Sequence, residues 1–169
     1  MAWVTPPTFA SNATPTAAQF DIISNDLAFL YNPPTCRIFN PNNQTLVSGV
    51  SFASLMPSED VDTDTMHSTS VNTERITFNT AGRYFFTSNA VQQSTLSGVR
   101  TMWVQDQAAN VYGKAAFPQA PISVNAALSV AGTMNAAATQ FISQFHFQNS
   151  GSNMILVGFP SLAAVWTGG

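Results

Sequence analysis

The chain has 169 residues, of which 45% are hydrophobic and only 8% are charged, and its net charge is −3. This length suits one domain with an appendage rather than two independent cores. The acidic balance and the scattered Lys and Arg residues argue against nucleic-acid binding, which needs a basic surface. A surface built mainly from uncharged polar side chains is typical of proteins that pack against copies of themselves or within a large assembly.

Residues 1–15 predict an extended arm, because they contain Pro6, Pro7 and Pro15 and show neither a helical nor a strand period. Such an arm needs a partner to become ordered. The N-terminus lacks the basic region and continuous apolar stretch of a signal peptide, so we expect none. No apolar run reaches membrane-spanning length, and we expect no insertion into a membrane.

Residues 16–31 predict a helix with one apolar seam. Thr16 and Gln19 have the spacing of a capping box at its start, and the double proline 33–34 ends it. Because so short a helix is marginal alone, we expect it to pack against symmetry mates or a larger partner. The seam residues, spaced as the a and d positions of a heptad, are Phe20, Ile23, Leu27 and Leu30.

After Pro34, short apolar or alternating segments separated by turn residues predict an antiparallel sandwich or barrel. We find no internal repeat and no second boundary, so we expect an arm-and-helix unit at 1–33 and a head domain at 34–169. The expected strands are 37–39, 46–47, 50–55, 75–78, 84–91, 100–105, 110–114, 122–130, 140–147 and 154–159.

Two aromatic patterns stand out in the head. Residues 139–148 alternate most clearly, with phenylalanines on one side and Gln or His on the other. Residues 84–86 are apolar on both sides, which predicts a strand buried once against the opposite sheet and once against a neighbouring subunit. The residues that we expect in the core or between subunits are Tyr84, Phe86, Phe141, Phe145 and Phe147.

Three N-terminal segments, WVTPPTF at 3–9, TAAQF at 16–20 and NPP at 32–34, carry a family resemblance. Together they resemble the leader of small virion proteins of tailed phages, especially phages of actinobacteria. In that group the leader precedes a head similar to the jelly rolls of C1q and tumour necrosis factor (TNF).

The head carries the same resemblance in four segments. RITFNTAGRY at 75–84 is similar to a family hairpin in which Gly82 supplies the turn conformation, and RTMWV at 100–104 is similar to an edge strand. FQNSG at 147–151 resembles a family turn, and LAAVWTG at 162–168 resembles the last strand. The chain departs from the family at 131–135, where AGTMN replaces a charged turn, so the strand ends there stay open.

The resemblance implies a homotrimeric jelly roll in a phage particle, made in the host cytoplasm and exposed on the virion. It implies a minor tail or fibre-tip protein that contacts other virion proteins and contributes to host attachment through a surface glycan. The alternative is a capsid decoration protein or head fibre, and a free C1q-like ligand-binding module is a third hypothesis. The residues expected to anchor the chain in the virion are Trp3, Pro6, Pro7 and Phe9.

Among chemical motifs, the alternating carboxylates Asp60, Asp62 and Asp64 suggest a calcium loop, but Thr65 and Val71 occupy positions where an EF-hand needs glycine and an acid. We therefore expect a solvated acidic loop and no metal, with calcium as the weaker alternative. His67 and His146 are isolated, and no nucleophile elbow, phosphate loop, zinc spacing or catalytic acid pair is found. The sequence therefore predicts a protein that is not an enzyme and has no cofactor.

The remaining candidates concern recognition. Trp103, Tyr112 and Trp166 are interpreted as packing residues, with a sugar-stacking platform as the alternative. Exposed loops are the more common recognition sites, and 92–98 and 115–121 are the candidates. The single cysteine, Cys36, cannot form an intramolecular disulfide and is expected to be a half-buried apolar side chain.

Overall fold

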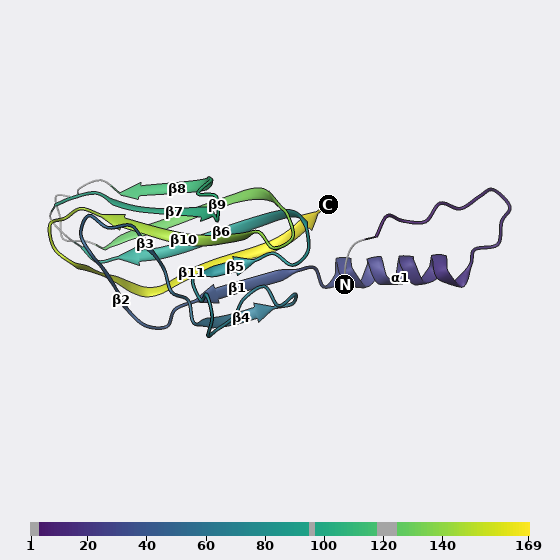
Figure 1. Ribbon diagram of the computed structural model, residues 1–169, viewed down its shortest axis with the longest axis horizontal. Helices are drawn as coiled ribbons and strands as arrows, with labels where there is room; N and C mark the ends of the chain where they lie inside the picture. Colours follow the sequence, from purple (N-terminus) through teal and green to yellow (C-terminus); the bar gives the residue numbers. More distant parts are fainter. Residues whose placement is uncertain (1–3, 95–96, 118–124) are drawn as a thin grey trace.

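The computed structural model describes residues 4–94, 97–117 and 125–169, and it consists of a β head with a stalk at one end (Figure 1). The stalk comprises the arm 4–15 and helix α1, Ala17–Tyr31. The predicted capping box is confirmed: the Gln19 N–H donates to Thr16 Oγ1 at 3.3 Å, and the Thr16 N–H donates to Gln19 Oε1 at 2.9 Å. No helix of the described residues is long and apolar enough to span a membrane.

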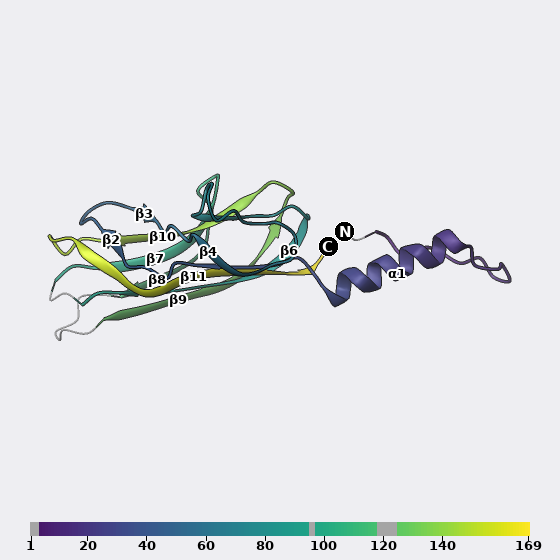
Figure 2. The same ribbon diagram turned by 90° about the horizontal axis from the view of Figure 1, so that it is seen from below.

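The head is a sandwich of two antiparallel sheets, as the strand pattern predicted, and Figure 2 shows it from the side with α1 continuing along its long axis. The six-stranded sheet has the order β4 (Ser58–Asp62), β1 (Thr35–Phe39), β11 (Met154–Gly168), β6 (Gly82–Gln92) and β9 (Ala126–Ala136), with β2 (Gln44–Leu46) also paired to β11. The five-stranded sheet has the order β3 (Phe52–Ala53), β10 (Phe141–Gln148), β7 (Arg100–Asp106) and β8 (Val111–Phe117), with β5 (Arg75–Thr77) paired to β10.

Several expectations about strands need correction. The segment 58–62 was expected to be a loop, but it forms edge strand β4; charged side chains suit an edge that must not pair further. Strands β5 and β6 lie in different sheets, so 75–84 is a corner and not a hairpin. Strand β7 lies between β10 and β8 and is not an edge. The AGTMN segment at 131–135 continues β9 to Ala136, paired to β6 throughout.

The core fills the space between the sheets. Tyr84 and Phe86 of β6 are fully buried there, as predicted, and their rings contact Phe78 and Tyr112 respectively. Cys36 is also fully buried, more deeply than expected, and burial raises the pKa of its thiol. It is therefore a packing residue and not a reactive thiol.

The stalk is joined to the head through Trp166 of β11. The Phe29 ring meets Trp166 edge-on at 4.8 Å between centroids, and the Trp166 main-chain N–H donates to the Pro34 carbonyl at 2.8 Å. Gly82 lies directly beside this ring with φ +145°, and a Cβ there would overlap the indole nitrogen and approach the Gly168 carbonyl to 2.7 Å. Gly82 is therefore needed both for its backbone conformation and for the space that Trp166 occupies.

The substitution Gly82→Ala should lower the free energy of unfolding by about 3 kcal/mol or more, because it adds a collision with Trp166 to the cost of a positive φ. Gly151→Ala is the matched control: Gly151 has φ +85° but open space around it, so only about 1–2 kcal/mol should be lost. Urea denaturation followed by fluorescence measures both. Equal losses in the two variants would contradict the proposed contact.

Candidate functional surfaces of the head and stalk

The predicted seam of α1 is uncovered in the single chain. Phe20 is 58% exposed, Leu27 61% and Leu30 52%, and Ile23 is half-buried. The buried residues of this helix are instead Asp26 and Phe29, which lie outside the seam. The helix thus presents an apolar stripe to solvent, although apolar stripes on stable helices normally pack against a partner.

The arm runs back along α1 (Figure 1) and leaves most of the seam exposed. The Val4 N–H donates to Asp26 Oδ1 at 3.1 Å, and Gln19 Nε2 donates to the Thr8 carbonyl at 3.1 Å. Of the residues expected to anchor the chain, Phe9 is 49% exposed, Pro6 is exposed and Pro7 is half-buried, while Trp3 lies outside the described residues. Their role as an anchor stays a prediction.

We call the outer surface of the six-stranded sheet around Phe85 the neutral face. Cross-strand pairing places Thr35, Val165, Phe85 and Thr133 in one row and Arg37, Ala163, Thr87 and Ala131 in the next. A shallow cavity of about 250 Å³ lies on it, and Phe85 is 40% exposed. Around Phe85, Arg37 forms an ion pair with Asp60 of β4. The other arginine on this side, Arg83, lies at the end of β6, so the central part of the face carries almost no net charge.

Strand β10 has the opposite orientation to the one expected. Ile142 and the polar side chains of Gln144, His146 and Gln148 face the interior and are fully buried. Phe141, Phe145 and Phe147 are half-buried on the outer surface, so they are not core residues, and the other place expected for them, between subunits, stays a prediction. The alternation of the sequence separates two sides of a strand but does not say which side a sandwich buries.

The buried polar side chains of β10 are hydrogen-bonded across the sandwich. Gln144 Nε2 donates to Ser88 Oγ at 2.7 Å and to the Ser161 carbonyl at 3.3 Å, both in the six-stranded sheet. Gln148 Nε2 donates to the Leu46 carbonyl at 3.0 Å. These bonds compensate the cost of burying the amides and tie the two sheets together.

His146 lies between two glutamines in this layer. Its Nε2 is 3.0 Å from Gln144 Oε1, and its Nδ1 is 3.0 Å from Gln92 Nε2. The neutral ring with its proton on Nε2 satisfies both contacts, because Gln92 then donates to the bare Nδ1. Burial lowers the pKa of His146 to about 3. This histidine is therefore a neutral structural residue, a role that the sequence did not distinguish from an exposed position.

We call the outer surface of the five-stranded sheet the aromatic face. Trp103 stacks on Phe145 with centroids 5.6 Å apart and planes 18° apart, and Lys114 Nζ lies 6.0 Å from the Trp103 ring on the next strand. At the other side of this face, the Arg75 guanidinium lies 4.4 Å from the Phe141 ring centroid. Among the described residues neither Lys114 nor Arg75 forms an ion pair, so this face is positively charged.

The proposed alternative of a sugar platform from three aromatic residues does not fit the geometry. Trp166 packs against Phe29 at the junction of stalk and head. The Tyr112 ring faces inward, and its hydroxyl donates to Asp106 Oδ2 at 2.9 Å. Only Trp103 lies on the outer surface. Of the loops proposed for recognition, residues 95–96 and 118–121 lie outside the described residues.

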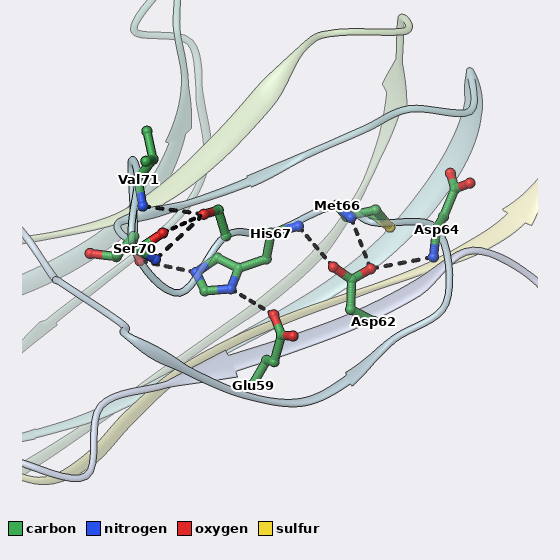
Figure 3. Close-up of polar contacts among 9 residues, drawn as sticks. Glu59, Asp62, Asp64, Met66, His67, Ser70 and Val71 are labelled. Atoms are coloured by element: carbon green, nitrogen blue, oxygen red, sulfur yellow. Dashed lines mark hydrogen bonds and ion pairs between the residues drawn. The ribbon is translucent and has the colours of Figure 1, made fainter.

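The acidic segment does not gather its carboxylates around a common point. Asp60 pairs with Arg37, whereas Asp62 accepts main-chain hydrogen bonds from Met66 at 2.8 Å and His67 at 2.9 Å (Figure 3). The His67 ring contacts Glu59 Oε2 at 2.9 Å through Nδ1. Within the described ranges no cluster of three acidic, His or Cys side chains could hold a metal ion. Asp62 shapes the loop instead, because its two oxygens accept hydrogen bonds from the main-chain N–H groups of Asp64, Met66 and His67.

The sequence and the structure of the chain differ in what they resemble among known proteins. No known protein family and no curated protein matches the sequence. Solved structures do: murine APRIL gives a TM-score of 0.61, with 79% of this chain and 98% of that chain covered. The Eiger TNF of S. frugiperda gives 0.58, covering 79% of this chain and 93% of that one. The globular domain of the zebrafish complement 1qA protein gives 0.55, covering 79% and 96% respectively.

The head has a C1q/TNF-like jelly-roll fold. The predicted fold class is therefore confirmed, with an arm and one helix preceding the jelly roll. Each of the three structures shares only 9% sequence identity with this chain, so the likeness concerns the fold.

The stability of the jelly roll should decrease in acid because of His146. Its pKa falls from 6.5 to about 3 on folding, so below pH 6.5 only the unfolded chain takes up this proton. The free energy of unfolding is therefore not reduced by this group above pH 6.5, and it should fall by about 1 kcal/mol per pH unit as the pH decreases from 6.5 towards 3. His146→Gln should show a flatter dependence over this window in urea titrations, whatever its absolute stability. An unchanged slope would contradict the assignment.

Proposed function

We propose that this protein is a homotrimeric, non-enzymatic structural protein of a phage particle, namely a minor tail or fibre-tip protein that is anchored through its stalk. Its jelly-roll head is exposed and contributes to attachment to the host surface. The observation that carries the proposal is the neutral face, an apolar sheet surface that the single chain leaves uncovered.

The two outer faces differ in their suitability for self-association. Three copies of the centre of the neutral face bring together alanines, threonines, Val165 and Phe85, and the charge of Arg37 is already balanced by Asp60. Arg83, at the end of β6, can stay at the rim of such a contact in solvent. Three copies of the aromatic face would bring together unpaired Arg75 and Lys114 side chains, and like charges across an interface cost several kcal/mol. We therefore assign subunit contacts to the neutral face and not to the phenylalanines of β10.

The stalk supports the same arrangement. The uncovered seam of α1 has heptad spacing, and a helix of 15 residues is too short to persist without a partner. Three seams packed around one axis would bury Phe20, Leu27 and Leu30, which are otherwise more than half exposed. The arm lies on the flank of the helix, where it remains accessible to another virion protein.

The virion assignment rests on the resemblance of the leader and head segments to phage virion proteins, and on the low charge of the chain. A capsid decoration protein or head fibre is the alternative, since the same arm can grip a shell. The two differ in copy number. Densitometry of purified particles should find few copies for a tail tip and many for a decoration protein, and immunogold labelling locates them.

The trimer can be tested by multi-angle light scattering, which should give about three times the chain mass of 18.1 kDa. Phe85→Glu should yield monomers, because each subunit contact would then bury an unpaired carboxylate. Val50→Glu is the matched control: Val50 is 53% exposed in the loop after β2, away from the neutral face, and its variant should stay trimeric. A monomeric wild-type chain would refute the trimer.

Deletion of residues 1–13 should leave a soluble trimer that no longer enters particles, because the seam and the neutral face remain while the arm is lost. Incorporation is measured by immunoblotting of particles purified after complementation with the truncated chain. The full-length chain expressed in the same way is the control. Unchanged incorporation of the truncated chain would show that the arm is not the anchor.

A further inference from the structure

A cavity of about 280 Å³ opens beside β5, at the edge of the aromatic face. Its wall is formed by β5 and by the loop that carries Met66, His67 and Val71. Figure 3 shows the polar contacts of this loop. The only Arg, Lys, Asp or Glu in its lining is Arg75, and most of the remaining lining is uncharged. The cavity thus combines one fixed positive charge with neutral hydroxyl and amide groups.

Several of these polar groups are available to a ligand. Within the described part of the chain, the side chains of Thr65, Asn72 and Thr77 make no hydrogen bond, although all three line the cavity. Arg75 has no carboxylate partner there and rests against the Phe141 ring. Donors and acceptors without protein partners, gathered in one concave place, are what an uncharged polar ligand with hydroxyl groups requires.

The neighbouring acidic groups do not neutralise Arg75. Glu59 is engaged by His67, Asp60 by Arg37, and Asp62 by main-chain N–H groups of its own loop. None of these three carboxylates lines the cavity, and neither does Glu74, the residue before Arg75, which forms no ion pair within the described residues. The positive charge of Arg75 is therefore available to an anionic group placed in the cavity.

The aromatic face extends this cavity into a longer surface. Strand pairing sets Arg75 beside Ser143 on β10, and the next outward row carries Phe145, Trp103 and Lys114 on successive strands. A chain-like ligand that leaves the cavity would therefore cross half-buried aromatic side chains and reach a second unpaired cation. Apolar C–H surfaces of sugar rings pack well against such aromatic side chains.

We propose that the cavity beside Arg75, together with the aromatic face, binds an acidic polysaccharide. An anionic sugar unit occupies the cavity, where Arg75 pairs with its charge and Thr65, Asn72 and Thr77 meet its hydroxyls. The following units lie over Phe145 and Trp103, and Lys114 pairs with a second anionic group. This proposal rests on the proposed function and names the chemical class of the surface ligand; with the neutral face buried between subunits, the aromatic face of each head stays free.

Because each head offers only two cations, we expect one head to bind the polysaccharide weakly and the three heads of a trimer to bind it strongly. A trimer that engages one polymer at several heads gains affinity through effective concentration without any new contact. The binding should weaken as salt is raised from about 0.05 M to about 0.5 M, because exposed ion pairs are screened.

The experiment measures binding of the full-length protein to immobilised polygalacturonate, phosphorylated dextran, dextran and polyglutamate by biolayer interferometry. We expect binding to one or both acidic sugar polymers and little to dextran or polyglutamate. Arg75→Gln should weaken that binding by about tenfold or more, and Thr77→Val by about threefold, since one removes a charged pair and the other one hydroxyl. Whether the polymer with carboxylates or with phosphates binds better identifies the anionic group.

Arg83→Gln is the matched control, because it removes one cation from a different cavity at the end of β6 and should leave the binding unchanged. An equal loss with Arg83→Gln, equal binding of polyglutamate or dextran, or no effect of Arg75→Gln would each overturn the proposal. The mass of every variant is measured in parallel. Trimers that bind none of the polymers would refute this inference and leave the proposed trimer standing. Monomers that bind the polymers would refute the proposed trimer and leave this inference standing.

Discussion

The hydrogen bonds that Gln144 and His146 make across the interior determine the surface chemistry of the head. Because these side chains find partners on Ser88, Ser161 and Gln92, the polar side chains of β10 can themselves be buried in hydrogen-bonded form. The other side of the strand must then face outwards, and with it the phenylalanines. The aromatic face is thus a consequence of a polar layer in the core.

The few charged residues of the chain are distributed unequally around the head. Carboxylates are concentrated on edge strand β4 and the loop after it, and on the aromatic face Arg75 and Lys114 form no ion pair within the described residues. In the centre of the neutral face Arg37 is paired with Asp60, while Arg83 lies at the end of β6. A surface with almost no net charge can be buried against its own copies at little electrostatic cost, whereas a positively charged one cannot. The proposed division of roles between subunit contact and ligand binding rests on this distribution.

The junction of stalk and head links these two surfaces to helix α1. Phe29 from α1 packs on Trp166 at the end of β11, and Gly82 leaves the space for that ring. Since β11 also pairs with β1 and β6 in the neutral face, the direction of the helix and the position of this face are set by one strand. A threefold axis through the seams of three helices is therefore compatible with contacts between three heads.

The sequence by itself determined the elements that depend on local chemistry. The capping box of Thr16, the prolines after Tyr31 and the turn-separated apolar segments fixed the helix and the antiparallel β class, because propensity and periodicity act within a few residues. Only the tertiary structure decided which side of β10 is buried, that the acidic segment becomes an edge strand, and that Arg75 borders a cavity formed by a distant loop. These features depend on partners far apart in the chain, such as Ser88 for Gln144, and alternation within one strand carries no information about them.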